Sequence, residues 1–155
     1  MKSKYLLILL ISMVPCAELR VAIPVAIGMY LPLLQSYITA IIGNMLPVPF
    51  IFFFARKILE WGKDKKYIGS FFSFCLNKGE KGGLELKKKA GRGLYLALFL
   101  FVGIPIPGTG AWTGTLAASL LDMDFKKSTL ACVLGVLLAG IIMGAASSGL
   151  FSFIR

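Results

Sequence analysis

Two charged residues lie inside an apolar stretch near the N-terminus, in the segment PCAELR at residues 15–20. Glu18 could carry a proton, and Arg20 could bind an anionic group. In a membrane, a buried charge costs about 2.5–3.5 kcal/mol on insertion scales, so it usually faces a partner or a wet cavity. Positions two apart on a helix do not face each other, so at least one of these side chains should point to another segment, to water or to a substrate. The alternative is an interfacial pair in which Arg20 extends to the lipid headgroups.

A second candidate site carries no charge. The segment GIPIPGTGAWTG at residues 103–114 gathers glycine, proline and threonine inside another apolar stretch. It should leave backbone N–H groups exposed just before a helix that begins near Ala111, where a helix N-terminus attracts negative charge. With Arg20, this predicts a place for an anionic group or for the polar end of an amphiphile; the alternative is that the glycines only allow close helix packing. The candidate residues here are Pro107, Gly108, Thr109, Gly110, Trp112 and Thr113.

Prolines interrupt a third segment, GNMLPVPF at residues 43–50. Pro47 and Pro49 cannot donate hydrogen bonds, so the carbonyls four residues before them lose their usual partners. In lipid those carbonyls need water, a side chain or an ion, and Asn44 is close enough along the chain to supply a donor. The break predicts either a simple kink or a hinge and site wall. On the second interpretation, Asn44, Pro47 and Pro49 join the candidate substrate and coupling residues.

These residues belong to a chain that is far more apolar than a soluble domain. Of its 155 residues, 57% are hydrophobic and 15% are charged, and the mean hydropathy is +0.83. A soluble domain has about 45–50% apolar and about 25% charged residues. Apolar runs cover residues 5–54 and 94–154 without the alternation typical of β-strands. The sequence therefore predicts an all-α integral membrane protein.

The titratable residues argue against an enzyme. The chain has no histidine, which removes His-based acid–base catalysis, nucleophile activation and metal ligation. Of the seven acidic residues, only Glu18 lies inside an apolar run. The three cysteines are far apart and form no C-x-x-C motif. We expect no catalytic residues, no metal and no cofactor.

Basic residues concentrate between the two apolar halves, where 11 of the 17 lysines and arginines fall between Arg56 and Arg92. The positive-inside tendency places this segment on the cytoplasmic face of a multi-pass protein of the cell membrane. Its lysines could contact anionic lipid headgroups, and the aromatic stretch 67–76 could form an interfacial helix. A nucleic-acid partner is not indicated, because the basic segment abuts the bilayer. The predicted organisation is membrane repeat 1–58, basic linker 59–92 and membrane repeat 93–155.

The two halves resemble each other at an offset of 92 residues. PCAELRVA (15–22) then aligns with PGTGAWTG (107–114), Ser36 with Ser128, and Gly43 with Gly135. This pattern indicates an internal duplication in which each half has two short helices separated by a break and then one long helix. The predicted ranges are 5–14, 16–30 and 33–58 in the first half, and 94–106, 111–121 and 126–153 in the second.

Each pair of short helices could form a re-entrant hairpin or one broken crossing of the membrane. Ten helical residues rise only about 15 Å, half of a hydrocarbon core of about 30 Å. We favour hairpins, because they make the two repeats inverted and bring both tips together. In secondary transporters, such broken helices meet at the substrate site near the middle of the membrane.

Several motifs closely resemble the small multidrug export protein family of prokaryotic membrane proteins. They are ELRVAIP, GNMLPVPF, GIPIPGTGAWTGTLAA and a later GVLLAG, and the resemblance covers nearly the whole chain outside the basic linker. It implies a transporter of small molecules. The proline and glycine hairpin is also similar in architecture to the DedA family, a group implicated in lipid-carrier translocation and membrane-potential homeostasis.

Three functional hypotheses follow. The first is an exporter coupled to protons or ions, with Glu18 as the ionisable relay. The second is a lipid translocase in which Arg20 and the amides of residues 108–112 hold a phosphate headgroup. The third is a non-transporting membrane subunit. Because 155 residues provide few crossings, we also expect a homodimer, joined through the glycine-rich face at residues 135–149, where Gly140 and Gly144 form a GxxxG pair.

Overall fold

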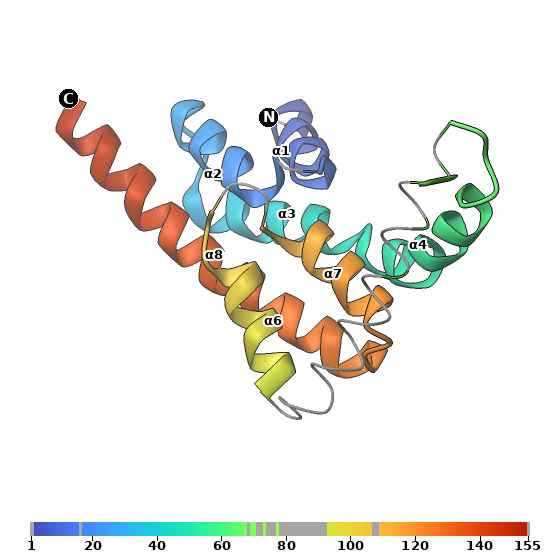
Figure 1. Cartoon of the computed structure of the whole chain (residues 1–155). Helices are drawn as coiled ribbons and strands as arrows, with labels where there is room; N and C mark the ends of the chain where they lie inside the picture. Colours follow the sequence, from blue (N-terminus) through green and yellow to red (C-terminus); the bar gives the residue numbers. More distant parts are fainter. Residues whose placement is uncertain are drawn as a thin grey trace.

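Helices make up every regular element in the part of the chain that the structure, a computed structural model, describes (Figure 1). The described residues are 2–15, 17–67, 69, 70, 73, 77, 93–106 and 109–154. The all-α prediction is confirmed. The helices are α1 (Lys2–Met13), α2 (Glu18–Gly28), α3 (Leu33–Met45), α4 (Val48–Gly62), α6 (Gly93–Gly103), α7 (Ala111–Leu120) and α8 (Phe125–Ile154).

The helix ends follow from the prolines and glycines of the sequence. α1 stops at Met13, two residues before Pro15, and α6 stops at Gly103, two residues before Pro105, because proline disfavours helical geometry in the residue that precedes it. The prolines at 47 and 49 divide the predicted helix 33–58 into α3 and α4. α4 also continues four residues beyond the predicted end, since Leu59 still packs into the interior.

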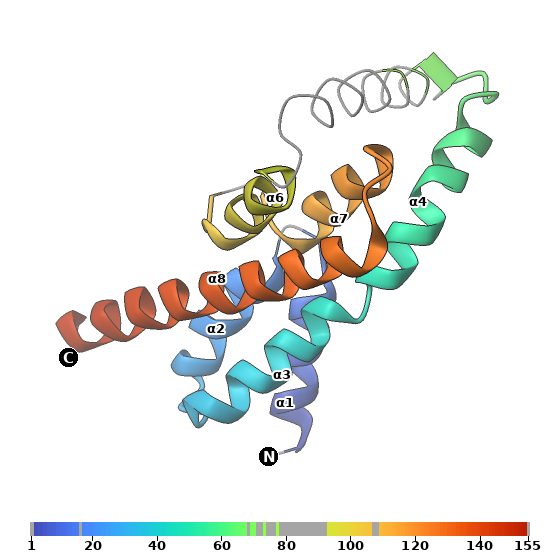
Figure 2. The same cartoon turned by 90° about the horizontal axis from the view of Figure 1, so that it is seen from below.

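Within the described residues, two segments are long and apolar enough to cross a membrane. They are Leu33–Gly62, which combines α3 and α4, and Phe125–Gly149 of α8. Figure 2 shows α3 and α4 following one bent path, while α8 is unbroken. Only 33% and 39% of their most apolar windows are buried, whereas the core helix of a soluble protein would be mostly buried.

Many large apolar side chains are exposed and several polar side chains are buried, which differs from the usual pattern of a soluble domain. Large apolar side chains such as Leu34, Phe50 and Ile141 are 65–74% exposed, and broad exposed apolar surface indicates contact with something other than water. The buried polar residues of the described part of the chain are Ser12, Glu18, Ser36, Asn44, Thr115, Ser119, Ser128 and Ser147. This distribution is consistent with a membrane protein, in which small polar residues commonly join helices.

The packing of the short helices brings the two halves together. α1 packs against α3 of its own half, and α6 packs against α8 of its own half. α2, by contrast, also packs against α8, and α7 packs extensively against α4. Each second short helix therefore crosses to the long helix of the other half, and the breaks before α2 and α7 meet in the interior.

Backbone features recur at the offset of 92 residues that the sequence suggested. Helical residues 33–62 correspond to 125–154, the bounds of α8. The described residues with positive φ also fall into two pairs 92 residues apart: Glu18 (46°) with Gly110 (134°), and Tyr30 (55°) with Asp122 (49°). One pair begins α2 and α7, and the other follows their ends. Such pairing is what an internal duplication predicts.

Gly43 and Gly135, another pair at this offset, let the first short helix of each half approach the long helix. A Cβ atom on Gly43 would lie 2.6 Å from the carbonyl oxygen of Leu9 in α1. A Cβ atom on Gly135 would lie 2.7 Å from Cβ of Val102 in α6. Both distances are shorter than ordinary carbon contacts, so the helices would have to separate.

Gly43→Ala should lower the free energy of unfolding by about 2 kcal/mol, because overfilling a packed interface typically costs 1–3 kcal/mol. The measurement is unfolding by sodium dodecyl sulfate in mixed micelles, followed by circular dichroism. Gly149→Ala is the matched control, since a Cβ atom there meets nothing within 4 Å. Equal stability of the two variants would contradict this account of the α1–α3 contact.

The glycine face that was expected to join two chains is used within the chain. Cβ atoms on Gly140 and Gly144 would lie 2.5 Å and 2.8 Å from atoms of the Tyr37 side chain in α3. Tyr37 therefore covers the GxxxG pair, and Gly149 is the position on this face that remains open. The homodimer remains a prediction, but it would need a surface other than Gly140 and Gly144.

Candidate functional site

Glu18 reaches from the start of α2 to the start of α7. Its side chain is buried, with an exposed fraction of 4%. One carboxylate oxygen accepts the backbone N–H of Ala111 at 3.1 Å, and the other accepts that of Trp112 at 3.0 Å. The first N–H groups of a helix have no partner within the helix, and its N-terminus attracts negative charge. Glu18 therefore caps a helix that lies 93 residues away in the chain.

Gly110 makes this approach geometrically feasible. Its φ of 134° and ψ of −175° lie in a region that is essentially restricted to glycine. A Cβ atom at this position would lie 2.2 Å from Oε2 of Glu18. The absence of a side chain thus lets the carboxylate reach the N–H groups of Ala111 and Trp112.

Arg20 binds the opposite kind of backbone group. Its guanidinium donates to the carbonyl oxygens of Ile104, at 3.3 Å, and Ile106. It also donates to the hydroxyl oxygen of Thr109 at 2.6 Å. The Thr109 hydroxyl lies 2.8 Å from the Ile106 carbonyl oxygen. Arg20 therefore satisfies acceptors in the irregular segment that follows α6.

Together, Glu18 and Arg20 and the backbone groups that they bind form what we call the tip clamp. The acid holds N–H groups at the beginning of α7, and the base holds carbonyls after the end of α6. Two residues apart on a helix, the side chains point in different directions, which suits two separate targets in the second half. We predicted that at least one of them would point to another segment, to water or to a substrate, and both bind another segment of the chain.

The groups expected to receive a substrate anion are occupied from within the chain. The Glu18 carboxylate lies on the N–H groups of Ala111 and Trp112, where we had expected an anionic substrate group. Thr113 donates its hydroxyl to the Gly110 carbonyl at 3.4 Å. The predicted site residues Pro107 and Gly108 lie outside the described residues.

Trp112 connects the tip clamp to a third segment and to a cavity. Its backbone N–H donates to Glu18, and its indole N–H donates to the carbonyl of Met13 at 3.1 Å, near the end of α1. The tryptophan therefore links the ends of α1, α2 and α7. Its ring also lines the wall of the cavity described below.

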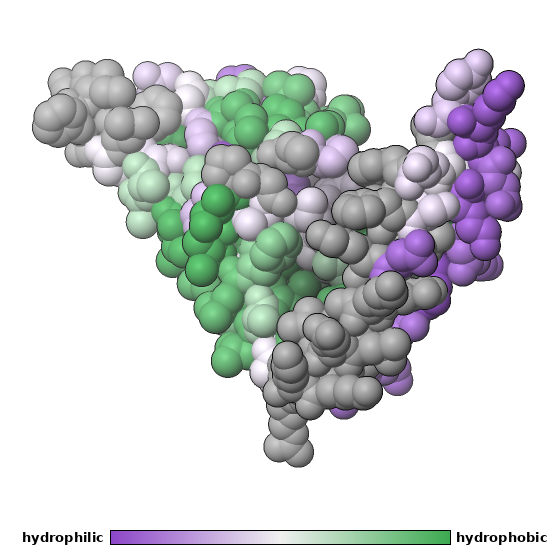
Figure 3. All heavy atoms as spheres, in the orientation of Figure 1, coloured by the Kyte–Doolittle hydropathy of each residue, from purple (hydrophilic) through white to green (hydrophobic). Residues whose placement is uncertain are grey.

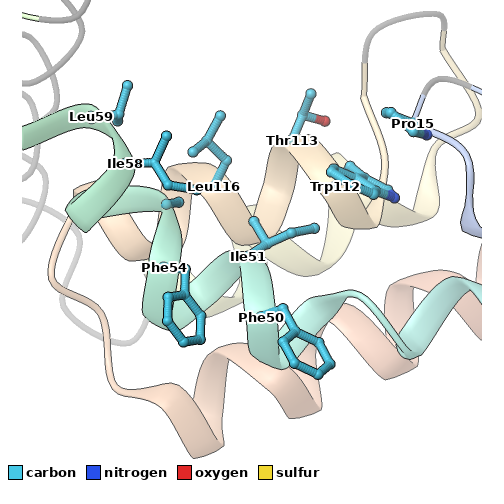
Figure 4. A pocket seen from close by; sticks show the side chains of 10 residues that line it. Pro15, Phe50, Ile51, Phe54, Ile58, Leu59, Trp112, Thr113 and Leu116 are labelled. Atoms are coloured by element: carbon cyan, nitrogen blue, oxygen red, sulfur yellow. The ribbon is translucent and has the colours of Figure 1, made fainter. Parts of the chain in front are cut away.

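An apolar cavity of about 760 Å³ lies between α4 and α7, beside the tip clamp (Figure 4). This volume falls within the range of about 300–1,000 Å³ typical of small-molecule sites. Its walls include Phe50, Ile51, Phe54 and Ile58 of α4 and Trp112 and Leu116 of α7. Of the residues that line the cavity, only Trp112 and Thr113 were predicted from the sequence as site residues. The recurrence of apolar residues at 50, 54 and 58, one turn apart on a helix, was the signal that could have indicated this wall.

The proline-rich break lies apart from the tip clamp. Pro47 precedes α4 and Pro49 is in its first turn, directly before Phe50 of the cavity wall. Asn44 is 2% exposed, and its side-chain oxygen has no hydrogen-bond partner among the described residues. Among the described residues, Asn44, Pro47 and Pro49 form none of the hydrogen bonds of the tip clamp. Their roles as hinge, site wall or coupling residues remain predictions.

These observations define an all-helical protein with an apolar exterior and a polar joint between its two halves. A family model described as "putative small multi-drug export protein" matches residues 18–142, which are 125 of the 155 residues. The chain belongs to this family, an export-protein family and not an enzyme family. The predicted family is thereby confirmed, while the DedA likeness stays a prediction. No curated protein and no solved structure matches the chain.

Proposed function

We propose that this protein exports small molecules across the cell membrane and that Glu18 couples export to protons. The observation that supports this most strongly is the tip clamp, in which a buried carboxylate joins α2 to the first turn of α7. Ionisable residues inside membrane proteins commonly mark proton or substrate pathways. In the proposed topology, the two repeats are inverted, both hairpins are re-entrant, and the basic linker 59–92 is cytoplasmic.

The chemistry of a carboxyl group gives the clamp two states. An ionised carboxylate has only acceptor oxygens, so it binds both N–H groups of α7. When a proton is added, one oxygen becomes a donor, and it opposes the N–H group that it previously accepted. Protonation of Glu18 would therefore weaken its hold on α7 and favour separation of the two tips.

Trp112 provides the connection between the clamp and the substrate. Its backbone N–H is held by Glu18, its indole N–H is held by the Met13 carbonyl, and its ring lines the cavity. A ligand that moves Trp112 would favour the open clamp, and the open clamp favours protonated Glu18. Binding linkage is reciprocal, so a proton on Glu18 would also change the affinity of the cavity for its ligand.

Glu18→Gln should abolish the dependence of transport on a pH gradient, because the amide keeps the size of the side chain but cannot bind and release a proton. The measurement is efflux of a cationic, a neutral and an anionic fluorescent amphiphile from proteoliposomes with and without an imposed gradient, with wild-type protein expected to accelerate the efflux of at least one of them only with the gradient. Glu60→Gln is the control, since Glu60 is an exposed residue of α4 that pairs with Arg56. An unchanged gradient dependence in Glu18→Gln would refute the coupling role.

A second assay, of lipid movement in the same proteoliposomes, separates the remaining hypotheses. A lipid translocase that holds a phosphate with Arg20 predicts that Arg20→Ala abolishes the movement of fluorescent phospholipid between leaflets. In the described structure, Arg20 instead donates to the chain's own carbonyls. If Glu18→Gln and Arg20→Ala both match wild type in every transport assay, the non-transporting subunit becomes the better hypothesis.

A further inference from the structure

The two ends of the cavity between α4 and α7 differ in their surroundings. Trp112 and Pro15 lie at the end next to the tip clamp, and Ile58 and Leu59 lie at the other end (Figure 4). None of the ten described residues that line it is charged. Phe50, Phe54 and Ile58 are also 52–65% exposed on the outer face of α4. A ligand in this cavity would therefore be surrounded by apolar groups and could enter from the side of the protein.

Two lysines lie near the Ile58 end of the cavity along the chain: Lys57 directly precedes Ile58 in α4, and Lys65 follows the end of that helix. The ammonium group of Lys57 is 5.8 Å from the centroid of the Phe54 ring, which lines the cavity. Trp61 follows Phe54 by seven residues and so lies on the same face of α4. The ammonium group of Lys65 is 4.4 Å from the centroid of the Trp61 ring. The apolar wall of the cavity thus continues into two cations held against aromatic rings.

The surroundings of these lysines are basic overall. Between residues 56 and 66 the chain has five basic and two acidic residues. One of the acids, Glu60, lies 3.4 Å from Arg56, which also forms an ion pair with Asp122 after the end of α7. Figure 3 shows hydrophilic residues of this face gathered over the end of α4. Apolar and positively charged surfaces therefore adjoin along one helix.

We propose that this cavity binds a single-chain anionic amphiphile. The alkyl chain would lie between α4 and α7 and reach Trp112, and the acidic headgroup would lie at Lys57 and Lys65. The inference rests on the proposed function, because it names the class of molecule that the exporter carries. It follows from charge complementarity: the two ammonium groups attract an acidic headgroup, whereas they provide no such attraction for a neutral apolar molecule.

A cationic amphiphile fits the same cavity less well. Its headgroup would meet Lys57 and Lys65, and like charges at close distance repel. Glu18, the acid that binds the backbone of Trp112, already accepts N–H groups with both oxygens. The chain of the ligand, by contrast, would reach Trp112 and so contact the residue that the clamp holds. The bound ligand would therefore contact Trp112, the same residue whose backbone N–H Glu18 holds.

Quenching of Trp112 fluorescence tests this proposal. Trp61→Phe leaves Trp112 as the single tryptophan and keeps an aromatic ring under Lys65. This protein, in nanodiscs of zwitterionic lipid, is titrated with bromododecanoate, bromododecanol and bromododecyl trimethylammonium, which share a brominated chain and differ in headgroup charge. We expect half-maximal quenching by the acid at a concentration about tenfold lower than by the alcohol, and lower still relative to the ammonium compound.

Matched lysine variants locate the headgroup. Lys57→Gln with Lys65→Gln should remove the tenfold preference for the acid. Lys63→Gln with Lys66→Gln removes the same charge but should retain the preference, because Lys63 lies half a turn away from Phe54 around α4. Equal quenching by the three compounds would overturn the proposal, and so would an equal loss in both lysine pairs. Binding is measured here without transport, so this result is separate from the Glu18→Gln test of the proposed function.

Discussion

Gly110→Ala should lower the free energy of unfolding by about 4 kcal/mol, the largest effect that we expect from one methyl group in this protein. The alanine would be held in a backbone region that costs side chains about 1–3 kcal/mol. Its Cβ atom would also occupy the position of the Glu18 carboxylate, 2.2 Å from Oε2. Glu18 can move away, but it then loses charge-assisted hydrogen bonds worth about 1.5–3 kcal/mol each. Unfolding by sodium dodecyl sulfate, followed by circular dichroism, measures the loss.

A double variant shows whether the clamp is the cause. In Gly110→Ala the carboxylate has already been displaced, so Glu18→Gln should add little further destabilisation. In the wild-type background, the same change should cost the interaction with α7. Contacting residues are commonly non-additive in this way. Fully additive effects would show that Gly110 and Glu18 act independently and would contradict the clamp.

Arg20→Ala should lower the free energy of unfolding by about 3 kcal/mol. The change removes the donors for the carbonyls of Ile104 and Ile106 and for the Thr109 hydroxyl. Ile104 and Ile106 are 44% and 53% exposed, so in a membrane their carbonyls would face lipid, where no water replaces the guanidinium and an acceptor without a partner costs about 1–3 kcal/mol. Arg20→Lys should recover only part of the loss, because one ammonium group cannot reproduce the fork of a guanidinium. The same denaturation assay measures both variants.

Arg56→Gln is the control for removal of an arginine. Arg56 also bonds across the two halves, to Asp122, but its side chain is 32% exposed and that of Asp122 is 62% exposed. Exposed ion pairs contribute about 0–1 kcal/mol. The expected loss is therefore well below that of Arg20→Ala. A similar loss for both variants would indicate a general effect of charge.

The breaks in this fold could be predicted from local sequence. Pro15 ends α1, the GIPIPGTG segment separates α6 from α7, and the prolines at 47 and 49 divide α3 from α4. Each effect acts within a few residues, because proline and glycine change the backbone where they stand. The predicted long helix 126–153 likewise differs from α8 by one residue at each end. The ends of the short helices differ more from their predicted positions, because the ends of a helix of about ten residues depend strongly on its caps.

The partners of the charged residues could not be predicted in the same way. Glu18 and Ala111 are 93 residues apart, and Arg20 and Ile106 are 86 residues apart. The sequence indicated a carboxylate at Glu18 and free N–H groups near Ala111. It did not show that the two would bind each other, because a bound anion could satisfy the same N–H groups. The cavity was missed because Phe50, Phe54 and Ile58 would also be unremarkable as lipid-facing residues. Only the packing of α7 against α4 makes them one wall.

The meeting of Glu18 with Gly110, its counterpart 92 residues later, has a consequence for how such a protein can be assembled. In a symmetrical pair of identical half-length chains, equivalent residues would face each other at this joint. Two glutamates would then repel, and two glycines would provide no charge. In a single chain the two halves can differ at this position. One half then provides the Glu18 carboxylate, and the other provides Gly110, which leaves space for it. Cutting the chain into halves and supplying the first half alone should therefore not yield a functional homodimer.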